Sequence, residues 1–194
     1  MKEDAEIITE DLKKACEILR QGGLVLYPTD TIWGIGCDAT HEEAVSRVYA
    51  LKQRTDYKAM LVLIDSPAKL NGYVSNIPDI TWDLLDVSDK PLTIIYPNAK
   101  NLSFNLLGED GSVGIRITKE RFSHELCKLF RKPLVSTSAN ISGLPSPARF
   151  SEIAEAVKSG VDYIVQYRQK ETASAKPSGI IKLGENGCIQ IIRE

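Results

Sequence analysis

The chain has 194 residues, of which 43% are apolar, 26% charged and 7% aromatic. This length suits one globular domain with a sizeable core and is too short for two comfortable ones. The 24 Lys and Arg nearly balance the 26 Asp and Glu. A net charge of −2 excludes both the coating of nucleic acid by bulk charge and a polyacidic disordered tail.

The cysteines and the N-terminus indicate the compartment. Wide spacing excludes C-x-x-C zinc or redox sites and a compact disulfide framework for Cys16, Cys37, Cys127 and Cys188. The acidic N-terminus is unlike a signal peptide, and no apolar run approaches the ~18 residues that span a membrane. We therefore expect reduced thiols, a cytoplasmic protein and no contact with membranes.

Helix and strand patterns alternate in the first part of the chain. Thr9 is the expected cap of a first helix, which Gly22-Gly23 ends and whose buried face comprises Leu12, Ala15, Cys16 and Leu19. The apolar run 24–27 predicts a buried strand that leads into a loop. Thr40 and Glu43 have the spacing of a capping box, which predicts the start of a second helix.

The remaining apolar runs predict further strands and helices. Strands are expected at 60–64, 92–96, 113–117, 133–137 and 163–166, with a closing hairpin of 179–183 and 188–192. Ser66-Pro67 has the pattern of a helix start. Two more helices are expected, one over 153–157 and one with the apolar face Phe122, Leu126, Leu129 and Phe130. The alternation predicts an α/β fold with a twisted mixed β-sheet flanked by helices, and not a clean Rossmann repeat.

Several familiar catalytic motifs are missing from the sequence. It contains no G-x-x-x-x-G-K-[ST], no G-x-G-x-x-G, no H-E-x-x-H and no G-x-S-x-G. Histidine chemistry has only His41 and His124 to draw on, and both are expected on helix surfaces. The sequence therefore points away from the commonest nucleotide, metalloprotease and hydrolase sites.

Two hydroxyl-rich segments follow predicted strands, where open α/β sheets bind ligands. Residues 28–38 place two threonines and an aspartate between a proline and a Gly-x-Gly, although ordinary turn chemistry explains many such segments. Residues 135–143 carry four hydroxyls and an amide. Ser136 and Ser138 point to one side of an extended segment, which favours a ligand site over a plain Ser/Thr turn.

A third polar segment, residues 52–58, carries Lys52, Arg54 and Lys58 against a single acidic residue. Directly after a helix C-terminus, such charges often interact only with the helix dipole and solvent. The alternative is a phosphate clamp, because Arg offers a planar fork and Lys a point charge to a polyphosphate. Spacing alone leaves both interpretations open.

Five motifs occur along the chain in this order: residues 28–38, 52–58, 111–117 and 135–143, then Lys176-Pro177-Ser178. This ordered set resembles the YrdC-like threonylcarbamoyl-AMP synthase family, over about residues 8–193. The resemblance implies a YrdC-like fold and a single catalytic domain over residues 1–194, without the additional C-terminal domain of longer members. The chain departs from the family's pattern at Trp33, where Tyr is common, and after Arg54, where many members carry Pro.

The resemblance implies an enzyme, a nucleotidyltransferase. Its reaction joins L-threonine, bicarbonate or CO2, and ATP into threonylcarbamoyl-adenylate and releases pyrophosphate. A separate transferase then moves the threonylcarbamoyl group to adenosine 37 of tRNA, which gives the t6A modification. Mg2+ is the implied cofactor, bound with ATP through few protein ligands, and no metal motif is expected in the chain.

The resemblance also implies roles for individual residues. Those implied to bind L-threonine are Thr31, Arg116, Ser136 and Ser178. Those implied to bind ATP are Arg54, Lys58, Ser138, Asn140, Ser146 and Arg193. Lys52 and Arg54 are the implied catalytic residues, and Lys52 and Asn140 are expected to line the same cavity. Arg116 suits the carboxylate of threonine because a guanidinium can bind it through two parallel hydrogen bonds.

Two other functions stay open at the level of sequence. A non-catalytic binder of double-stranded RNA or tRNA with the same fold would need a basic face, and residues 116–132 hold six basic and two acidic side chains. A relative with an altered substrate is the other possibility. The intact run Ser136-Thr137-Ser138-Ala139-Asn140 favours threonine as the substrate.

Overall fold

The computed structural model of the protein describes residues 2–54, 60–173, 175–184 and 186–194. The elements up to residue 96 are α1 (Lys2–Arg20), β1 (Val25–Tyr27), β2 (Gly34–Gly36), α2 (Glu42–Leu51), β3 (Leu61–Ile64), α3 (Leu70–Tyr73), α4 (Ile80–Val87) and β4 (Leu92–Tyr96). The later elements are β5 (Val113–Ile117), α5 (Arg121–Phe130), β6 (Leu134–Ser138), α6 (Glu155–Ser159), β7 (Tyr163–Ile164), β8 (Gly179–Leu183) and β9 (Ile189–Arg193). Short 3-10 helices occur at η1 (Pro67–Lys69), η2 (Phe104–Leu106) and η3 (Phe150–Glu152).

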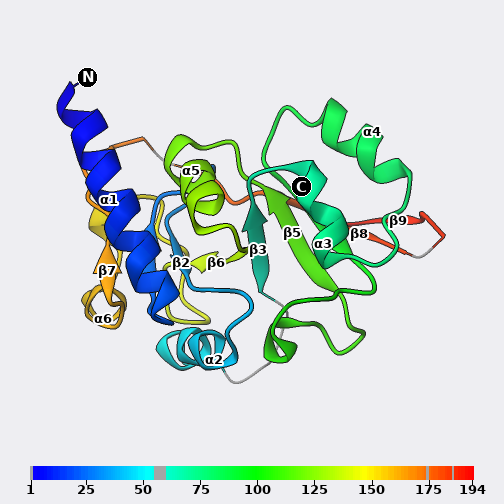
Figure 1. The fold of residues 1–194 in the computed structure, drawn as a ribbon, viewed down its shortest axis with the longest axis horizontal. Coiled ribbons are helices and arrows are strands. Elements are labelled where there is room, and N and C mark those ends of the chain that lie inside the picture. The colour runs from blue at the N-terminus through cyan, green and yellow to red at the C-terminus, as the bar shows by residue number, and fades with distance from the viewer. Residues whose placement is uncertain (1, 55–59, 174, 185) are drawn as a thin grey trace.

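The described strands form one sheet in the order β7-β1-β2-β6-β3-β5-β4-β8-β9. The pairs β1–β7, β3–β5 and β4–β8 are parallel, whereas the other neighbours run antiparallel. Helices α1 and α5 pack against each other, and α1 also contacts β1 and β7 (Figure 1). The predicted α/β class, a mixed sheet flanked by helices, is therefore confirmed.

Side chains of the central strands alternate between the apolar core and a polar face. Ile94 and Ile115 lie in the core and are at most 2% exposed. Thr93 and Arg116, one position away on the same strands, pair across β4 and β5 and line a cavity. Ile180 of β8 pairs with Thr93 and lines the same cavity. The period of two in a strand thus gathers polar groups from distant segments on one face.

Gly36 and Gly34 of β2 lie where the chain has no room for larger side chains. A Cβ atom at Gly36 would lie 2.5 Å from Cε1 of Tyr27 and 2.8 Å from the carbonyl oxygen of Val135. A Cβ atom at Gly34 would lie 3.1 Å from the hydroxyl of Ser136. The Gly-x-Gly of this segment therefore serves close packing of β1, β2 and β6 beside the cavity.

Two predicted helix starts are wrong. Thr9 lies inside α1, where its hydroxyl donates to a carbonyl one turn earlier at 2.8 Å and does not cap the helix. The cap of α2 is His41, whose ring accepts a hydrogen bond from the helix backbone at 3.2 Å. Thr40, the predicted cap, donates instead to Asp38 at 2.6 Å. In both cases a competing local acceptor engages the threonine hydroxyl.

The strand predictions hold better than the helix predictions. β4 and β5 have the predicted bounds, whereas the strand predicted at 163–166 shortens to β7. The helix start predicted at Ser66-Pro67 is confirmed: Ser66 accepts from the amide of Ala68 at 3.3 Å and caps η1, which continues directly into α3. The strand β2 and the helix α4 were not predicted, and no side chain caps α4. Leu129, expected on the buried face of α5, is 44% exposed, whereas Cys127 lies on that face and is buried. His124, expected at the surface, is half-buried.

No described helix combines the length and the apolar character needed to cross a membrane. The four cysteines are free thiols, three of them buried and Cys188 exposed. Burial raises the pKa of Cys37 and Cys127 above its ordinary value, which makes these two thiols poor nucleophiles.

Candidate active site

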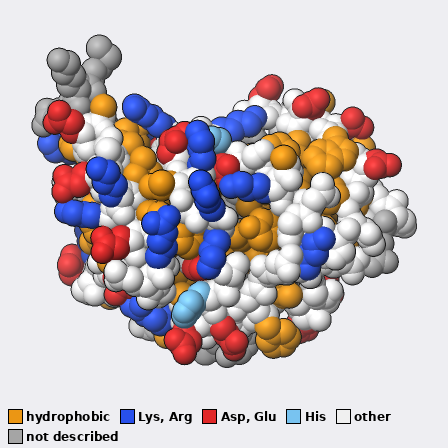
Figure 2. All heavy atoms as spheres, in the orientation of Figure 1, with side chains coloured by type: hydrophobic (Ala, Val, Ile, Leu, Met, Phe, Trp, Pro, Cys, Tyr) orange, Lys and Arg blue, Asp and Glu red, His pale blue; other side chains and the backbone are white. Residues whose placement is uncertain are grey.

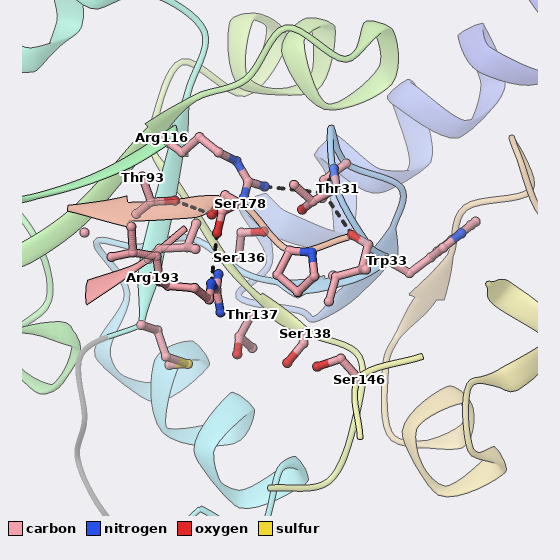
Figure 3. Close-up of a pocket in the computed structure, with 18 of the residues that line it drawn as sticks. Thr31, Trp33, Thr93, Arg116, Ser136, Thr137, Ser138, Ser146, Ser178 and Arg193 are labelled. Atoms are coloured by element: carbon pink, nitrogen blue, oxygen red, sulfur yellow. Dashed lines mark hydrogen bonds between the residues drawn. The ribbon is translucent and has the colours of Figure 1, made fainter. Parts of the chain in front are cut away.

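A cavity of about 320 Å³ opens over the middle of the sheet (Figure 3). Its walls combine strands β3, β4, β5, β6 and β8 with the loop between β1 and β2, the loop after β6 and the last strand. The polar side chains on these walls are Thr29, Thr31, Arg54, Thr93, Arg116, Ser136, Thr137, Ser138, Ser146, Ser178 and Arg193. The fold therefore unites all three polar segments of the sequence with residues near the C-terminus.

Arg116 lies at one end of this cavity and is only 3% exposed. Its Nη2 lies 3.4 Å from the hydroxyl of Thr29, and its Nε lies 3.7 Å from a carboxylate oxygen of Asp30. Burial lowers the pKa of Arg116, and the adjacent charge of Asp30 opposes that shift. A guanidinium buried in a cavity wall is well suited to hold a ligand carboxylate through paired hydrogen bonds.

Thr29 organises the turn beside Arg116. Its hydroxyl donates to the carbonyl of Ile32 at 2.9 Å and accepts from the amide of Thr31 at 3.1 Å. The hydroxyls of Thr29 and Thr31 lie 3.1 Å apart. Figure 3 shows the Thr31 side chain facing the Arg116 guanidinium. These bonds fix a second polar group at the same end of the cavity before any ligand binds.

Ser178, Ser136 and Arg193 lie between the two ends of the cavity (Figure 3). The hydroxyls of Ser178 and Thr93 are 2.9 Å apart, and both side chains are buried. Arg193 Nε donates to the carbonyl of Ser178 at 2.9 Å, which attaches β9 to the site. Hydroxyls both donate and accept, so this middle region suits a ligand group of mixed polarity.

The opposite end of the cavity carries Ser138 and Ser146, and Arg54 lines the cavity close to Lys52, whose ammonium donates to the Ser138 carbonyl. Figure 3 shows the two serines next to each other and away from Arg116. Ser138 and Arg54 are half-buried, and Ser146 is exposed. A guanidinium with hydroxyl donors in an open setting suits phosphate oxygens.

Trp33 forms a wall of the cavity and links two loops. Its ring packs on Phe150 with centroids 4.9 Å apart, and the Lys158 ammonium lies 4.9 Å from the centroid of Phe150. Phe150 follows the loop that carries Ser146. The aromatic contact therefore holds the Thr31 turn and the Ser146 loop in a fixed relation.

Lys52 and Asn140 support the loop after β6 and are not among the residues that line the cavity. The Lys52 ammonium donates to the carbonyls of Ser138 and Asn140 at 2.5 and 2.8 Å and to Oδ1 of Asn140 at 3.2 Å. Asn140 Oδ1 also accepts from the Ser138 hydroxyl at 2.5 Å. The prediction that both residues line the cavity is wrong, because these bonds direct their polar atoms into the turn itself.

The charge state of Lys52 reflects this buried position. Burial, together with the nearby charge of Arg54, lowers the pKa of Lys52 to about 8. All its hydrogen-bond acceptors that the structure describes are neutral oxygens of Ser138 and Asn140. Lys52 therefore acts on the site through the loop that presents Ser138.

The structure brings most of the predicted binding residues together. Eight of them line the cavity, namely Thr31, Arg54, Arg116, Ser136, Ser138, Ser146, Ser178 and Arg193. Lys58 lies outside the described residues. Thr29 and Thr93 also line the cavity but were not predicted. A hydroxyl in an otherwise apolar strand, as at Thr93, is the signal that could have identified that residue.

The electrostatics of the cavity favour anions. Its described lining includes Arg54, Arg116 and Arg193 but no Asp or Glu. Within the described parts of the chain, no group of three or more His, Cys, Asp or Glu could hold a metal ion. The arrangement can bind one anionic group at each end and hold uncharged polar groups between them.

Comparisons with known proteins agree with this site. A family model described as Sua5_yciO_yrdC, telomere recombination, matches residues 17–194. Proteins named threonylcarbamoyl-AMP synthase from Psychromonas ingrahamii and Pseudoalteromonas translucida are each 35% identical, over 77% and 89% of this chain and 80% and 92% of theirs. The crystal structure of P. abyssi Sua5 complexed with L-threonine matches with a TM-score of 0.79 and 27% identity, covering 89% of this chain and 50% of that one. The chain therefore belongs to the Sua5/YciO/YrdC family, which confirms the resemblance seen in its sequence.

Proposed function

We propose that this protein joins L-threonine, bicarbonate or CO2, and ATP into threonylcarbamoyl-AMP and releases pyrophosphate. The observation that carries this proposal is the polarity of the cavity: a buried guanidinium at one end, an arginine with two serines at the other, and hydroxyls between (Figure 3). An amino-acid carboxylate fits the first end and a polyphosphate the second. The names of the two bacterial relatives and the L-threonine bound to P. abyssi Sua5 support the same activity.

L-Threonine binds at the Arg116 end in this proposal. Arg116 takes the carboxylate, and the hydroxyls of Thr31, Ser136 and Ser178 are available for the amino and hydroxyl groups. An analogue that lacks the hydroxyl would leave buried polar groups without partners, which is costly. The buried end of the cavity thus supplies selectivity for the amino acid.

ATP binds toward the open end, where Arg54, Ser138 and Ser146, together with Arg193 from the middle of the cavity, meet its phosphates. We assign Lys58 to the same ligand from the family motif alone. Lys52 and Asn140 contribute by holding the Ser138 loop, so we treat both as positioning residues. Arg54 is the residue that we propose to act directly on the reacting phosphates.

The proposed chemistry forms no covalent bond between substrate and protein. The neutral amine of threonine adds to CO2 with loss of a proton, or to bicarbonate with loss of water, and a carbamate results in both cases. A carbamate oxygen then attacks the α-phosphorus of ATP while the bond to pyrophosphate breaks. Catalysis comes from two effects: the site holds both ligands in line, and Arg54 stabilises the charge on the departing pyrophosphate.

The donor set of the cavity fits Mg2+ that arrives with ATP. The described lining residues offer hydroxyls and no carboxylate. Mg2+ keeps several waters and is commonly bound through phosphates with few protein ligands. When bound, it neutralises phosphate charge, and the hydroxyls of Ser138 and Ser146 are the side chains that could complete its shell.

The product is an activated carbamoyl group, which a further enzyme must transfer. We propose that a separate transferase uses it to form t6A at adenosine 37 of tRNA and that both steps take place in the cytoplasm. The residues described here would then form the catalytic domain that supplies the activated group.

A binder of double-stranded RNA or tRNA without catalysis is the weaker candidate. Figure 2 shows Lys and Arg side chains gathered over α1 and α5. Much of the charge of residues 116–132 is engaged, however: Arg116 is buried in the cavity, Lys128 pairs within its own helix at 3.7 Å, and Lys132 pairs with Asp38 at 2.6 Å. Such pairing lowers the free positive charge that binding to phosphate backbones requires.

A turnover assay separates these candidates. The purified protein, given L-threonine, bicarbonate and Mg-ATP, should release pyrophosphate in equal amount to threonylcarbamoyl-AMP measured by mass spectrometry. Omission of threonine or bicarbonate should abolish both signals. Pyrophosphate release that does not depend on threonine would contradict the proposal. Salt-dependent binding of double-stranded RNA without turnover would favour the alternative.

A further inference from the structure

Asp30 lies directly behind Arg116, between the cavity and the start of α5. Its Oδ1 accepts hydrogen bonds from the backbone amides of Lys119 at 2.6 Å and Glu120 at 2.9 Å. Its Oδ2 accepts from the hydroxyl of Thr118 at 2.6 Å and lies 3.7 Å from Nε of Arg116. The two carboxylate oxygens thus have separate duties, one toward the backbone and one toward the guanidinium.

Arg116 has few other contacts that could fix its orientation. Nε is buried and has no hydrogen-bond partner among the described residues. Nη2 reaches only the hydroxyl of Thr29, at 3.4 Å. Asp30 is the acidic side chain paired with Arg116, and their side chains are 9% and 3% exposed. A charge pair with so little solvent around it is weakly screened and can orient a guanidinium strongly.

We propose that Asp30 is a positioning residue for substrate binding: it holds the Nε side of Arg116 and thereby directs the terminal N–H groups of the guanidinium into the cavity. Figure 3 shows this guanidinium beside Thr31 at the same end of the cavity. The inference rests on the proposed function, in which Arg116 binds the threonine carboxylate. Because the pair is preformed, threonine binding does not have to order the arginine side chain.

Asp30→Asn separates this role from support of the backbone. An asparagine can keep Oδ1 on the two amides of Lys119 and Glu120 while it replaces the charged oxygen that faces Arg116. The variant therefore removes the charge pair and the acceptor of the Thr118 hydroxyl, and it retains the two backbone bonds from Lys119 and Glu120 that fix the start of α5.

Asp38→Asn is a matched control. Asp38 Oδ1 accepts from the amide of Thr40 at 2.8 Å, and its Oδ2 pairs with Lys132 at 2.6 Å. Asp38 is 3% exposed, and none of these three residues lines the cavity. Asp38, like Asp30, accepts from a backbone amide through one oxygen and pairs with a cation through the other. The control therefore removes a comparable carboxylate away from the substrate.

Calorimetric titration with L-threonine and, separately, with ATP tests the proposal. Asp30→Asn should raise the dissociation constant for threonine at least about fivefold, the scale of one charge-assisted contact, with the constant for ATP unchanged within twofold. Asp38→Asn should leave both constants unchanged. In an Arg116→Ala background, Asp30→Asn should have no further effect on threonine, because its action passes through the guanidinium.

The outcomes distinguish this inference from the proposed function. Unchanged or tighter threonine binding by Asp30→Asn, with normal binding by the wild type, overturns the inference alone. Equal weakening of threonine binding and ATP binding by Asp30→Asn also overturns the inference, because it would indicate a general structural role. A full Asp30→Asn effect in the Arg116→Ala background also overturns it. Absence of threonine binding by the wild type overturns the proposed function and this inference with it.

Discussion

The two ends of the cavity differ in how strongly their side chains are buried and held in place before a ligand binds. At the Arg116 end and in the adjoining middle of the cavity, which together form its buried part, the residues Thr31, Arg116, Ser136 and Ser178 are 8%, 3%, 5% and 2% exposed. At the opposite end, Ser138 and Arg54 are half-buried and Ser146 is exposed. The first end is tied by strand pairing and internal hydrogen bonds, and the second is carried largely by loops.

This difference matches the chemistry of the two proposed ligands. A small amino acid presents few atoms, so its recognition depends on buried and prearranged polar groups. ATP is larger and highly charged, and an open basic surface can bind it while the released pyrophosphate departs. Replacing a polar residue at the buried end should therefore lower both the free energy of unfolding and the affinity for ligand. Replacing one at the open end should lower only the affinity for ligand.

The largest expected effect is that of Arg116→Ala on threonine binding. Loss of paired charge-assisted hydrogen bonds, worth roughly 3 kcal/mol, should raise the dissociation constant for threonine about a hundredfold. ATP affinity should change by less than about threefold. Isothermal titration calorimetry with each ligand measures the loss of threonine affinity and the loss of ATP affinity separately. Arg116→Lys, which keeps the charge but not the planar fork, should recover part of the loss, and equal loss of both ligands would contradict the two-ended cavity.

A pH titration of stability tests the buried position of Lys52. Its folded-state pKa is lowered to about 8 from 10.5, so the unfolded chain binds more protons between these pH values. The cost of burying the charge is fully present below pH 8 and is relieved above it. The free energy of unfolding should rise by about 1–3 kcal/mol from pH 8 to 10.5 relative to that of Lys52→Met.

Urea unfolding of both proteins across this range gives the difference. Titrations of tyrosines and cysteines are common to both chains and cancel in the comparison. A difference that stays flat or falls with pH would mean that Lys52 is not charged and buried in the loop after β6.

Arg54→Ala should weaken the binding of ATP and leave the binding of threonine unchanged. Removal of one half-buried guanidinium from the phosphate end should raise the dissociation constant for ATP about tenfold, because other basic residues remain. Threonine affinity should stay within about twofold, and the free energy of unfolding should hardly change. Calorimetry with each ligand provides the test, and weaker threonine binding of similar size would show that the ends are not separate.

The smallest effects come from a pair of serine substitutions. Ser178→Ala removes the partner of the buried Thr93 hydroxyl and should lower the free energy of unfolding by about 1 kcal/mol, with threonine bound about fivefold more weakly. Ser146→Ala, at an exposed position, should leave stability within about 0.5 kcal/mol. Thermal unfolding and titration of the two variants side by side compare the ends directly, and equal losses of stability would remove the distinction.

The sequence predicts the strands well because their signal is local. Short segments rich in β-branched residues, bounded by turn residues, identify β4 and β5 to the residue. The starts of α1 and α2 were missed because α1 begins seven residues before Thr9, whose hydroxyl donates to a carbonyl inside the helix, and because Thr40 donates to Asp38 while His41 accepts from the amide of α2. That competition depends on geometry which a capping pattern does not contain.

The site was predictable where family motifs name the residues, and less so where tertiary contacts decide. Lys52 was assigned to the cavity by its motif, yet its ammonium turns toward the loop carbonyls after β6. Thr93 is one hydroxyl in an apolar strand, and only the pairing of β4 with β5 puts it beside Arg116. Asp30 was visible as a carboxylate in a turn, but its contact with Arg116 requires segments far apart in the chain to meet.

A crystal structure with L-threonine and a non-hydrolysable ATP analogue tests the central claim most directly. The threonine carboxylate should lie within hydrogen-bond distance of the Arg116 guanidinium, and the phosphates should lie against Arg54, Ser138 and Ser146. The threonine amine should point toward the α-phosphorus with room for one carboxyl group between them. Phosphates bound at Arg116, or threonine bound outside this cavity, would contradict it.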